Sequence, residues 1–249
     1  MINEEFYTAP ASTVQKRMLV YTPPGYIGEP LPVLYLLHGI SQTEESWEEQ
    51  CGASEILDKA ITEGSARPMI AVMPNGRAVE GGALPGEKFG LENVRSFMDF
   101  ESEFISVILP EIDKRYPTLP DRNSRAVTGF SMGGYQSVNF GLAHLDKFAY
   151  VGGFSPAPSA DAKYSLREFM KDNADADINS MLKLFYLSNG TAEKGGEGIF
   201  GEFATVSERC LEYMSRTDIR CVYETYPGGH EPTVWRQSLY SFIQKIFLN

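Results

Sequence analysis

Runs of apolar residues recur along this chain at the lengths expected of buried strands. Leu31–Leu37 and Met69–Met73 are almost continuous apolar runs, which is the pattern of strands buried on both faces of a sheet. Shorter or alternating runs predict further strands. These are Val14–Thr22, Arg125–Thr128, Phe148–Gly152, Leu182–Leu187 and Cys221–Tyr226.

Segments with helical spacing lie between the predicted strands. They are Ser54–Glu63, Phe97–Tyr116, Tyr135–Ala143, Phe203–Ser215 and a last helix that Pro232 opens. Pro110 is expected to kink or split the helix that contains it. Strands that alternate with helices predict an α/β fold with a mainly parallel central sheet and helices on both faces.

No repeat, low-complexity tract or linker divides the sequence, so residues 1–249 are interpreted as one domain. Arg77–Gly90 is rich in glycine and charge and is predicted to be a long loop after a strand, a position that is often functional. The polar, irregular stretch around 157–179 is predicted to be a small cap or lid.

One short stretch, Gly129 to Gly134, contains the pattern G-x-S-x-G between a predicted strand and a predicted helix. Strand, tight turn and helix form the setting of a nucleophile elbow. The serine hydroxyl must stand clear of the backbone and reach a base that removes its proton. Gly129 and Gly133 have no Cβ to clash in such a turn. The pattern alone also fits an ordinary glycine-rich turn, but its setting favours Ser131 as a nucleophile.

The chain has three histidines, and one of them follows the last predicted strand. His230 lies in a Gly-Gly-His turn that leaves its ring free to reach Ser131 as a base. His38 is expected to shape the oxyanion turn, and His144 is expected to be a surface or capping residue at the end of the helix after the elbow.

The third member of a hydrolase triad is a carboxylate that orients the histidine. Glu193 is the first acid after the strand that precedes it, and the chain order Ser, acid, His is that of α/β-hydrolases. Glu197 and Glu202 are the alternative acids. Backbone N–H groups of Met132 and Ile40 are predicted to form the oxyanion hole, where losing one donor typically costs about 3 kcal/mol of transition-state stabilisation.

Two tryptophans are candidates for an apolar slot that would hold an acyl group. Trp47 and Trp235 are the residues in question, and core packing is the alternative for each. Cys51, Cys210 and Cys221 form neither a C-x-x-C pair nor a ligand cluster, so they are interpreted as buried apolar residues, with one disulfide as the alternative. The sequence implies neither a metal nor an organic cofactor.

The formal net charge is −11, which argues against a nucleic-acid or anionic-membrane partner. No apolar run approaches the roughly 20 residues of a membrane span. The first residues show no signal-peptide pattern, so the protein is expected to be cytoplasmic or to have lost a leader. The oligomeric state is open.

With these residues in place, the chain resembles the feruloyl and acetyl-xylan esterases of carbohydrate esterase family 1, within the esterase-D-like α/β-hydrolases. The resemblance covers most of the chain and rests on several short motifs. They are Tyr21–Tyr26, Pro32–Ile40, Met73–Asn75, Gly129–Gly134, Leu145–Ala149, Asn189–Thr191 and Gly228–His230.

The resemblance implies Ser131 as nucleophile, His230 as base, and Ile40 and Met132 as oxyanion donors. It also implies ferulate or acetate esters on plant polysaccharide as substrates, and it favours a secreted protein. The family usually has Asp where this chain has Glu193, and the extra methylene shifts the carboxylate.

Other functions stay open at this point. One is a small-molecule or thioester hydrolase of the same superfamily, such as an S-formylglutathione hydrolase-like or siderophore-type esterase. Another, from a different class, is a non-catalytic carbohydrate-binding descendant of an esterase. The departure at Glu193 favours the second, and the intact Ser131 and His230 argue against it.

Overall fold

The computed structural model of the chain describes residues 1–10, 12–157, 177–193 and 203–248. Most of the stretch at 157–179 that is predicted to form a lid lies outside these residues. The alternative acids Glu197 and Glu202 lie outside them as well.

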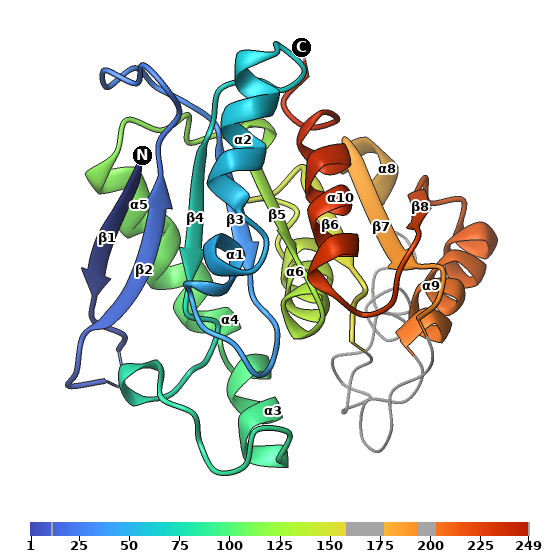
Figure 1. The fold of residues 1–249 in the computed structure, drawn as a ribbon, viewed down its shortest axis with the longest axis horizontal. Coiled ribbons are helices and arrows are strands. Elements are labelled where there is room, and N and C mark those ends of the chain that lie inside the picture. Colours follow the sequence, from blue (N-terminus) through green and yellow to red (C-terminus); the bar gives the residue numbers. More distant parts are fainter. Residues whose placement is uncertain (11, 158–176, 194–202, 249) are drawn as a thin grey trace.

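Within the described residues, eight strands form one sheet in the order β1-β2-β4-β3-β5-β6-β7-β8 (Figure 1). β2 pairs antiparallel with β1 and with β4, and every other neighbouring pair is parallel. The strands are β1 (Ile2–Tyr7), β2 (Lys16–Tyr21), β3 (Val33–Leu37), β4 (Ile70–Pro74), β5 (Arg125–Gly129), β6 (Tyr150–Phe154), β7 (Leu184–Gly190) and β8 (Val222–Tyr226).

Helices cover both faces of the sheet. In Figure 1, α1 (Ser46–Glu49), α2 (Ala53–Thr62) and α10 (Pro232–Ile243) lie in front of it. The helices behind are α4 (Glu101–Glu103), α5 (Leu109–Arg115), α6 (Met132–Ala143), α8 (Ile178–Met181) and α9 (Phe203–Thr217). α3 (Leu91–Met98) lies beyond the lower edge of the sheet. The predicted α/β class is therefore confirmed.

The central strand β3 shows why its sequence is uninterruptedly apolar. Val33, Tyr35 and Leu37 belong to the core on the α5–α6 side, and Leu34 and Leu36 belong to the core on the α2–α10 side. Because successive side chains of a strand point to opposite faces, a strand covered on both faces needs apolar residues at every position.

Two parts of the prediction differ from the structure. The strand β1 is absent from the prediction, because it lies at the edge of the sheet and most of its residues are exposed or half-buried. The single helix predicted at Phe97–Tyr116 is divided into the end of α3, α4, a π-helix at Phe104–Ile108, and α5. Pro110 lies at the start of α5, where its missing N–H is tolerated.

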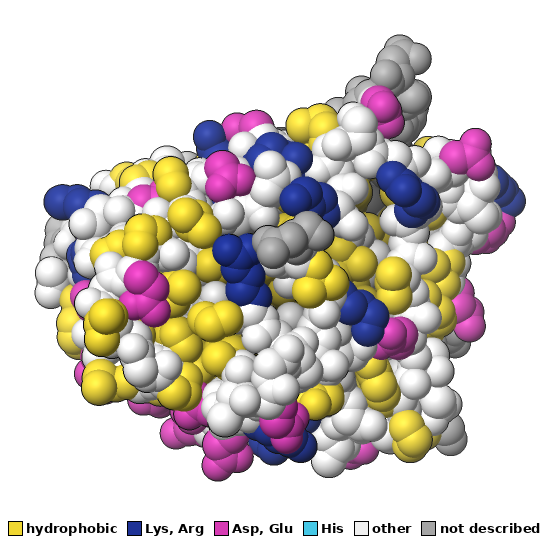
Figure 2. Space-filling view, turned by 90° about the horizontal axis from the view of Figure 1, so that it is seen from above, with side chains coloured by type: hydrophobic (Ala, Val, Ile, Leu, Met, Phe, Trp, Pro, Cys, Tyr) yellow, Lys and Arg dark blue, Asp and Glu magenta, His cyan; other side chains and the backbone are white. Residues whose placement is uncertain are grey.

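The parallel strands end at the lower edge of the sheet in Figure 1, next to α3. Figure 2 shows the opposite edge, where hydrophobic side chains gather on the side of β1 and β2 and charged side chains of both signs are scattered. Residues that follow the parallel strands therefore meet at the lower edge, away from the face in Figure 2.

No helix among the described residues is long and apolar enough to cross a membrane.

Candidate active site

Ser131 stands in the tight turn between β5 and α6, with φ 57° and ψ −120°. A non-glycine residue in this region is strained, and such strain persists only where the surroundings fix it. The two flanking glycines show how crowded the turn is. A Cβ on Gly133 would lie 2.1 Å from the carbonyl oxygen of Leu37, and one on Gly129 would lie 2.5 Å from the same oxygen. The chain can make this turn only with glycine at both positions.

The predicted base and acid lie together beside this serine. His230 Nε2 is 2.9 Å from Ser131 Oγ, and His230 Nδ1 is 3.3 Å from Glu193 Oε1. The Glu193 side chain is fully buried, and about a quarter of the His230 side chain is exposed. A carboxylate facing Nδ1 favours the tautomer with its proton there, which leaves the Nε2 lone pair for the serine hydroxyl.

The loops that bring acid and base together pack backbone against backbone. A Cβ on Gly190, at the end of β7, would lie 2.4 Å from the carbonyl oxygen of Gly228. Ala192 N–H donates to that same oxygen over 2.8 Å. The absence of a side chain at Gly190 therefore lets the Glu193 loop and the His230 loop touch.

The two predicted oxyanion donors flank the serine. Met132 is the first residue of α6, so its N–H has no acceptor within the helix. The Gly39 carbonyl accepts from Gln42 N–H over 3.2 Å and lies 2.8 Å from His38 Nδ1. Because a trans peptide directs its C=O and N–H to opposite sides, the Ile40 N–H points away from these partners.

His38 is buried below this turn. Its Nε2 accepts the N–H of Gly76 over 2.9 Å, so the ring proton is on Nδ1, which donates to the Gly39 carbonyl. Burial, together with the nearby charge of Arg77, lowers the pKa of His38 to about 3. His38 thus stays neutral and shapes the turn, whereas His144 caps α6 and contacts Glu101.

The two tryptophans occupy different environments. Trp47 is completely buried, donates from Nε1 to the Leu37 carbonyl over 3.1 Å and packs on Phe130, so it is a core residue with no surface for a ligand. Trp235 stacks on Phe130 with ring centroids 4.2 Å apart and lies nearly perpendicular to the His230 ring, with centroids 5.2 Å apart. Trp235 therefore packs between Phe130 and the His230 ring.

Next to Ser131 lies an apolar cluster that was not predicted from the sequence. It combines the side chains of both oxyanion residues with α3, which was not predicted as a separate helix. Its members are Ile40, Val94, Phe97, Met98, Met132, Tyr135 and Ala157. The only available signal was the apolar spacing of Val94, Phe97 and Met98.

The three cysteines are free thiols, and Cys51 and Cys210 are buried. The alternative of a disulfide is therefore wrong. Within the ranges that the structure describes, no three His, Cys, Asp or Glu side chains group as metal ligands. The site thus brings together the side chains predicted as nucleophile, base and acid, together with the two predicted backbone donors.

Comparison with known proteins identifies the family of the chain. The profile of the Esterase family matches residues 13–246. The chain belongs to this family. Over 214 residues it is 33% identical to the endo-1,4-beta-xylanase/feruloyl esterase of Xylanibacter ruminicola. This match covers 80% of this chain and 28% of that protein. The chain thus spans less than a third of the length of that relative.

Solved structures give the same placement. The CE1 ferulic acid esterase of Anaeromyces mucronatus superposes with a TM-score of 0.83 at 28% identity, over 99% of this chain and 90% of that one. Among the sequence relatives, the S-formylglutathione hydrolase of Arabidopsis thaliana is 28% identical over 135 residues, which cover 50% of this chain and 45% of that protein. The predicted family and the α/β-hydrolase fold are confirmed, and this is a family of serine carboxylic ester hydrolases.

Proposed function

We propose that this chain is a serine esterase that releases ferulate-type or acetyl groups from plant cell-wall polysaccharide. The observation that supports it most is the line of contacts from Ser131 Oγ through the His230 ring to the buried carboxylate of Glu193. The function is proposed for residues 1–249 as a single domain.

In the first half of the reaction, Ser131 Oγ attacks the ester carbonyl while His230 Nε2 takes the hydroxyl proton. The carbonyl oxygen becomes an oxyanion, and the N–H groups of Met132 and Ile40 donate to it. Glu193 stabilises the imidazolium that forms. When the tetrahedral intermediate collapses, the C–O bond to the sugar breaks, and the sugar oxygen takes the proton from His230.

In the second half, a water molecule takes the place of the sugar alcohol. His230 Nε2 accepts one proton of the water, and the hydroxide attacks the acyl-enzyme carbonyl. The same two N–H groups donate to the second oxyanion. Collapse releases the carboxylic acid and returns the proton to Ser131 Oγ.

The substrate class is proposed from similarity. The relative from Xylanibacter ruminicola is named a xylanase and feruloyl esterase, and the Anaeromyces mucronatus enzyme was solved in complex with ferulic acid. The apolar cluster beside Ser131 is compatible with an aromatic acyl group. The similarity to an S-formylglutathione hydrolase makes a small acyl thioester the competing substrate.

The test compares hydrolysis of methyl ferulate, an acetylated xylo-oligosaccharide and S-formylglutathione by the same protein. Ser131→Ala is the catalytic blank, and Ser106→Ala, which alters an exposed serine, is the matched control. We expect turnover of an oxygen ester that Ser131→Ala abolishes and Ser106→Ala retains. Turnover confined to the thioester would replace the proposed substrate, and turnover that survives Ser131→Ala would overturn the mechanism.

A further inference from the structure

Arg77 is almost completely buried although it opens a glycine-rich, charged loop. Its guanidinium donates from Nη2 to the carbonyl oxygens of Ile40 and Gln42, over 2.9 and 2.6 Å, and from Nε to Asn93 Oδ1 over 3.0 Å. The group also lies over the Phe97 ring at 5.1 Å. A buried charge is thus directed at the backbone of the turn that contains Ile40.

Asn93 reaches the same turn from α3. Its Nδ2 donates to the Ile40 carbonyl over 3.1 Å and to the Lys88 carbonyl over 2.7 Å. The Ile40 carbonyl therefore accepts from Arg77 and Asn93 together. The preceding carbonyl, that of Gly39, is held by His38 and Gln42. The Ile40 N–H thus lies between two carbonyl groups that are each held by two contacts.

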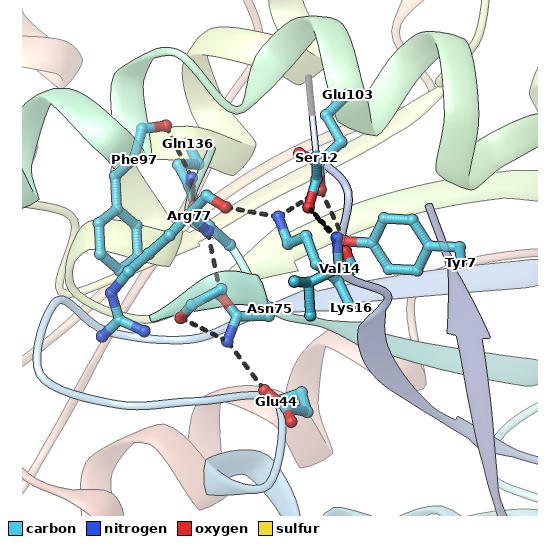
Figure 3. Close-up of polar contacts among 12 residues, drawn as sticks. Tyr7, Ser12, Val14, Lys16, Glu44, Asn75, Arg77, Phe97, Glu103 and Gln136 are labelled. Carbon is cyan, nitrogen blue, oxygen red and sulfur yellow. Dashed lines mark hydrogen bonds and ion pairs between the residues drawn. The ribbon is translucent and has the colours of Figure 1, made fainter. Parts of the chain in front are cut away.

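Buried polar side chains hold the backbone of Arg77 (Figure 3). Lys16 of β2 donates from Nζ to the Arg77 carbonyl over 2.5 Å and forms an ion pair with Glu103. The Arg77 N–H donates to Asn75 Oδ1 over 3.3 Å, and Asn75 Nδ2 donates to Glu44 over 3.0 Å. The sheet and the helical layer therefore hold the backbone from which the Arg77 side chain extends.

We propose that Arg77 and Asn93 are positioning residues of the oxyanion hole. They fix the carbonyl of the peptide that follows Ile40, and Arg77 also holds the carbonyl of Gln42, whose N–H donates to Gly39. Because the Gly39 carbonyl shares its peptide plane with the Ile40 N–H, holding the turn on both sides of Ile40 restricts the direction in which that N–H points at the developing oxyanion. The inference rests on the proposed function, in which Ile40 is a donor. Pre-positioned donors are effective because they need no reorganisation when charge develops, and a displacement of about 1 Å can cost on the order of 100-fold in rate.

The test uses Asn93→Ala, Arg77→Met and Arg77→Lys. Asn93→Ala keeps the buried charge and removes one donor to the Ile40 carbonyl, so it is the variant least exposed to a folding defect. Arg77→Lys retains a charge that can reach one carbonyl. Arg125→Met is the matched control, because Arg125 is also buried but pairs with Asp113 at the start of β5.

Each variant is measured for kcat and KM on the ester that the wild type hydrolyses best, and for inhibition by a trifluoromethyl ketone analogue of that ester. The ketone forms a tetrahedral adduct with the serine and so reports on the oxyanion hole directly. Ser131→Ala again supplies the blank. Thermal unfolding of every variant shows how much stability each substitution removes.

We expect Asn93→Ala and Arg77→Met to lower kcat by about 10- to 100-fold with KM changed by less than about threefold. Affinity for the ketone should fall by the same factor as kcat/KM, Arg77→Lys should recover part of the loss, and Arg125→Met should lose stability without losing kcat. If both Asn93→Ala and Arg77→Met kept the wild-type kcat and the wild-type affinity for the ketone, this inference would be overturned and the proposed function would stand. An inactive wild type, or activity independent of Ser131, would overturn the proposed function and the inference with it.

Discussion

Asn189 donates a hydrogen bond from Nδ2 to Oε2 of Glu193 over 2.6 Å, while the other oxygen of that carboxylate, Oε1, faces His230 at 3.3 Å. Asn189 is 1% exposed and the Glu193 side chain is fully buried. The resemblance implies that the family usually has the shorter aspartate at this position. The buried amide at the end of β7 therefore gives the longer glutamate a fixed orientation.

The first prediction concerns this pair. A hydrogen bond to a charged group contributes about 1.5–3 kcal/mol, so Asn189→Ala should lower kcat by about tenfold or more. Glu193→Gln should cost more, on the order of 10⁴-fold, because it removes the charge that stabilises the imidazolium. Steady-state kinetics on the best oxygen ester measures both.

A double-mutant cycle separates orientation of Glu193 from general damage. In a Glu193→Ala background, Asn189→Ala should have no further effect on kcat, because its partner is gone. Asn179→Ala is the matched control, since Asn179 is a half-buried asparagine of α8 that donates to the Asp218 carbonyl. Equal losses in both backgrounds would contradict the assigned role.

The second prediction concerns the crowded elbow. Gly133→Ala places a Cβ 2.1 Å from the Leu37 carbonyl oxygen, a backbone atom that cannot move aside without disrupting β3. The free energy of unfolding should fall by more than the ~3 kcal/mol typical of overpacking. Gly229→Ala is the control, because its Cβ would meet no atom within 4 Å, and it should stay within about 0.5 kcal/mol. If urea unfolding gave the two variants equal free energies of unfolding, crowding by the Leu37 carbonyl would not be the reason for glycine at position 133.

The sequence predicted the strands and the site at the sheet edge because both are local patterns. Parallel strands buried on two faces give continuous apolar runs, as in Leu31–Leu37, and the residues after them meet at one edge. Ser131, His230 and Glu193 were located in this way, and the structure brings the three together. Their catalytic roles stay a prediction that the kinetics above would test.

The supporting contacts could not be predicted in the same way. Arg77 lies at the start of the stretch that is predicted to be a long loop, and nothing in its neighbours along the chain shows that α3 and β2 cover it. Trp47 could have lined a slot or filled the core, and only the tertiary packing on Phe130 decides for the core. Such contacts join residues far apart in sequence, so no local pattern encodes them.

The third prediction concerns the buried ion pair of Lys16 and Glu103, whose side chains are 0% and 8% exposed. Removing one partner leaves an uncompensated buried charge, so Lys16→Met should cost about 3–5 kcal/mol of unfolding free energy. The double variant Lys16→Met/Glu103→Gln should be destabilised less than Lys16→Met alone. Its neutral amide leaves no buried charge and still offers an oxygen to the Tyr7 hydroxyl that bonds to Glu103.

Chemical unfolding of the two single variants and the double variant at one pH gives the coupling energy of the pair. Lys114→Met is a suitable control, because Lys114 is exposed and pairs only loosely with Glu111 at 3.9 Å. If the double variant were less stable than Lys16→Met, the cost would come from lost packing and not from a stranded carboxylate.

The last prediction follows from His38. Its pKa is about 3 in the folded protein, because the ring is buried and lies near Arg77, and the ordinary value is 6.5. Below pH 6.5 the unfolded chain therefore binds a proton at His38 that the folded protein does not, so stability falls as the pH drops. Between pH 6.5 and pH 5 the free energy of unfolding should fall by about 2 kcal/mol on this account, at about 1.36 kcal/mol per pH unit.

His38→Asn should remove that part of the pH dependence. The unfolding free energy of the variant should be lower than that of the wild type at pH 7, and the difference should shrink by about 2 kcal/mol at pH 5. His144→Asn controls for the loss of a histidine at the end of α6, next to Glu101. Urea unfolding at both pH values decides the matter: a difference between wild type and His38→Asn that stays constant would mean that the folded protein protonates His38 as readily as the unfolded chain does.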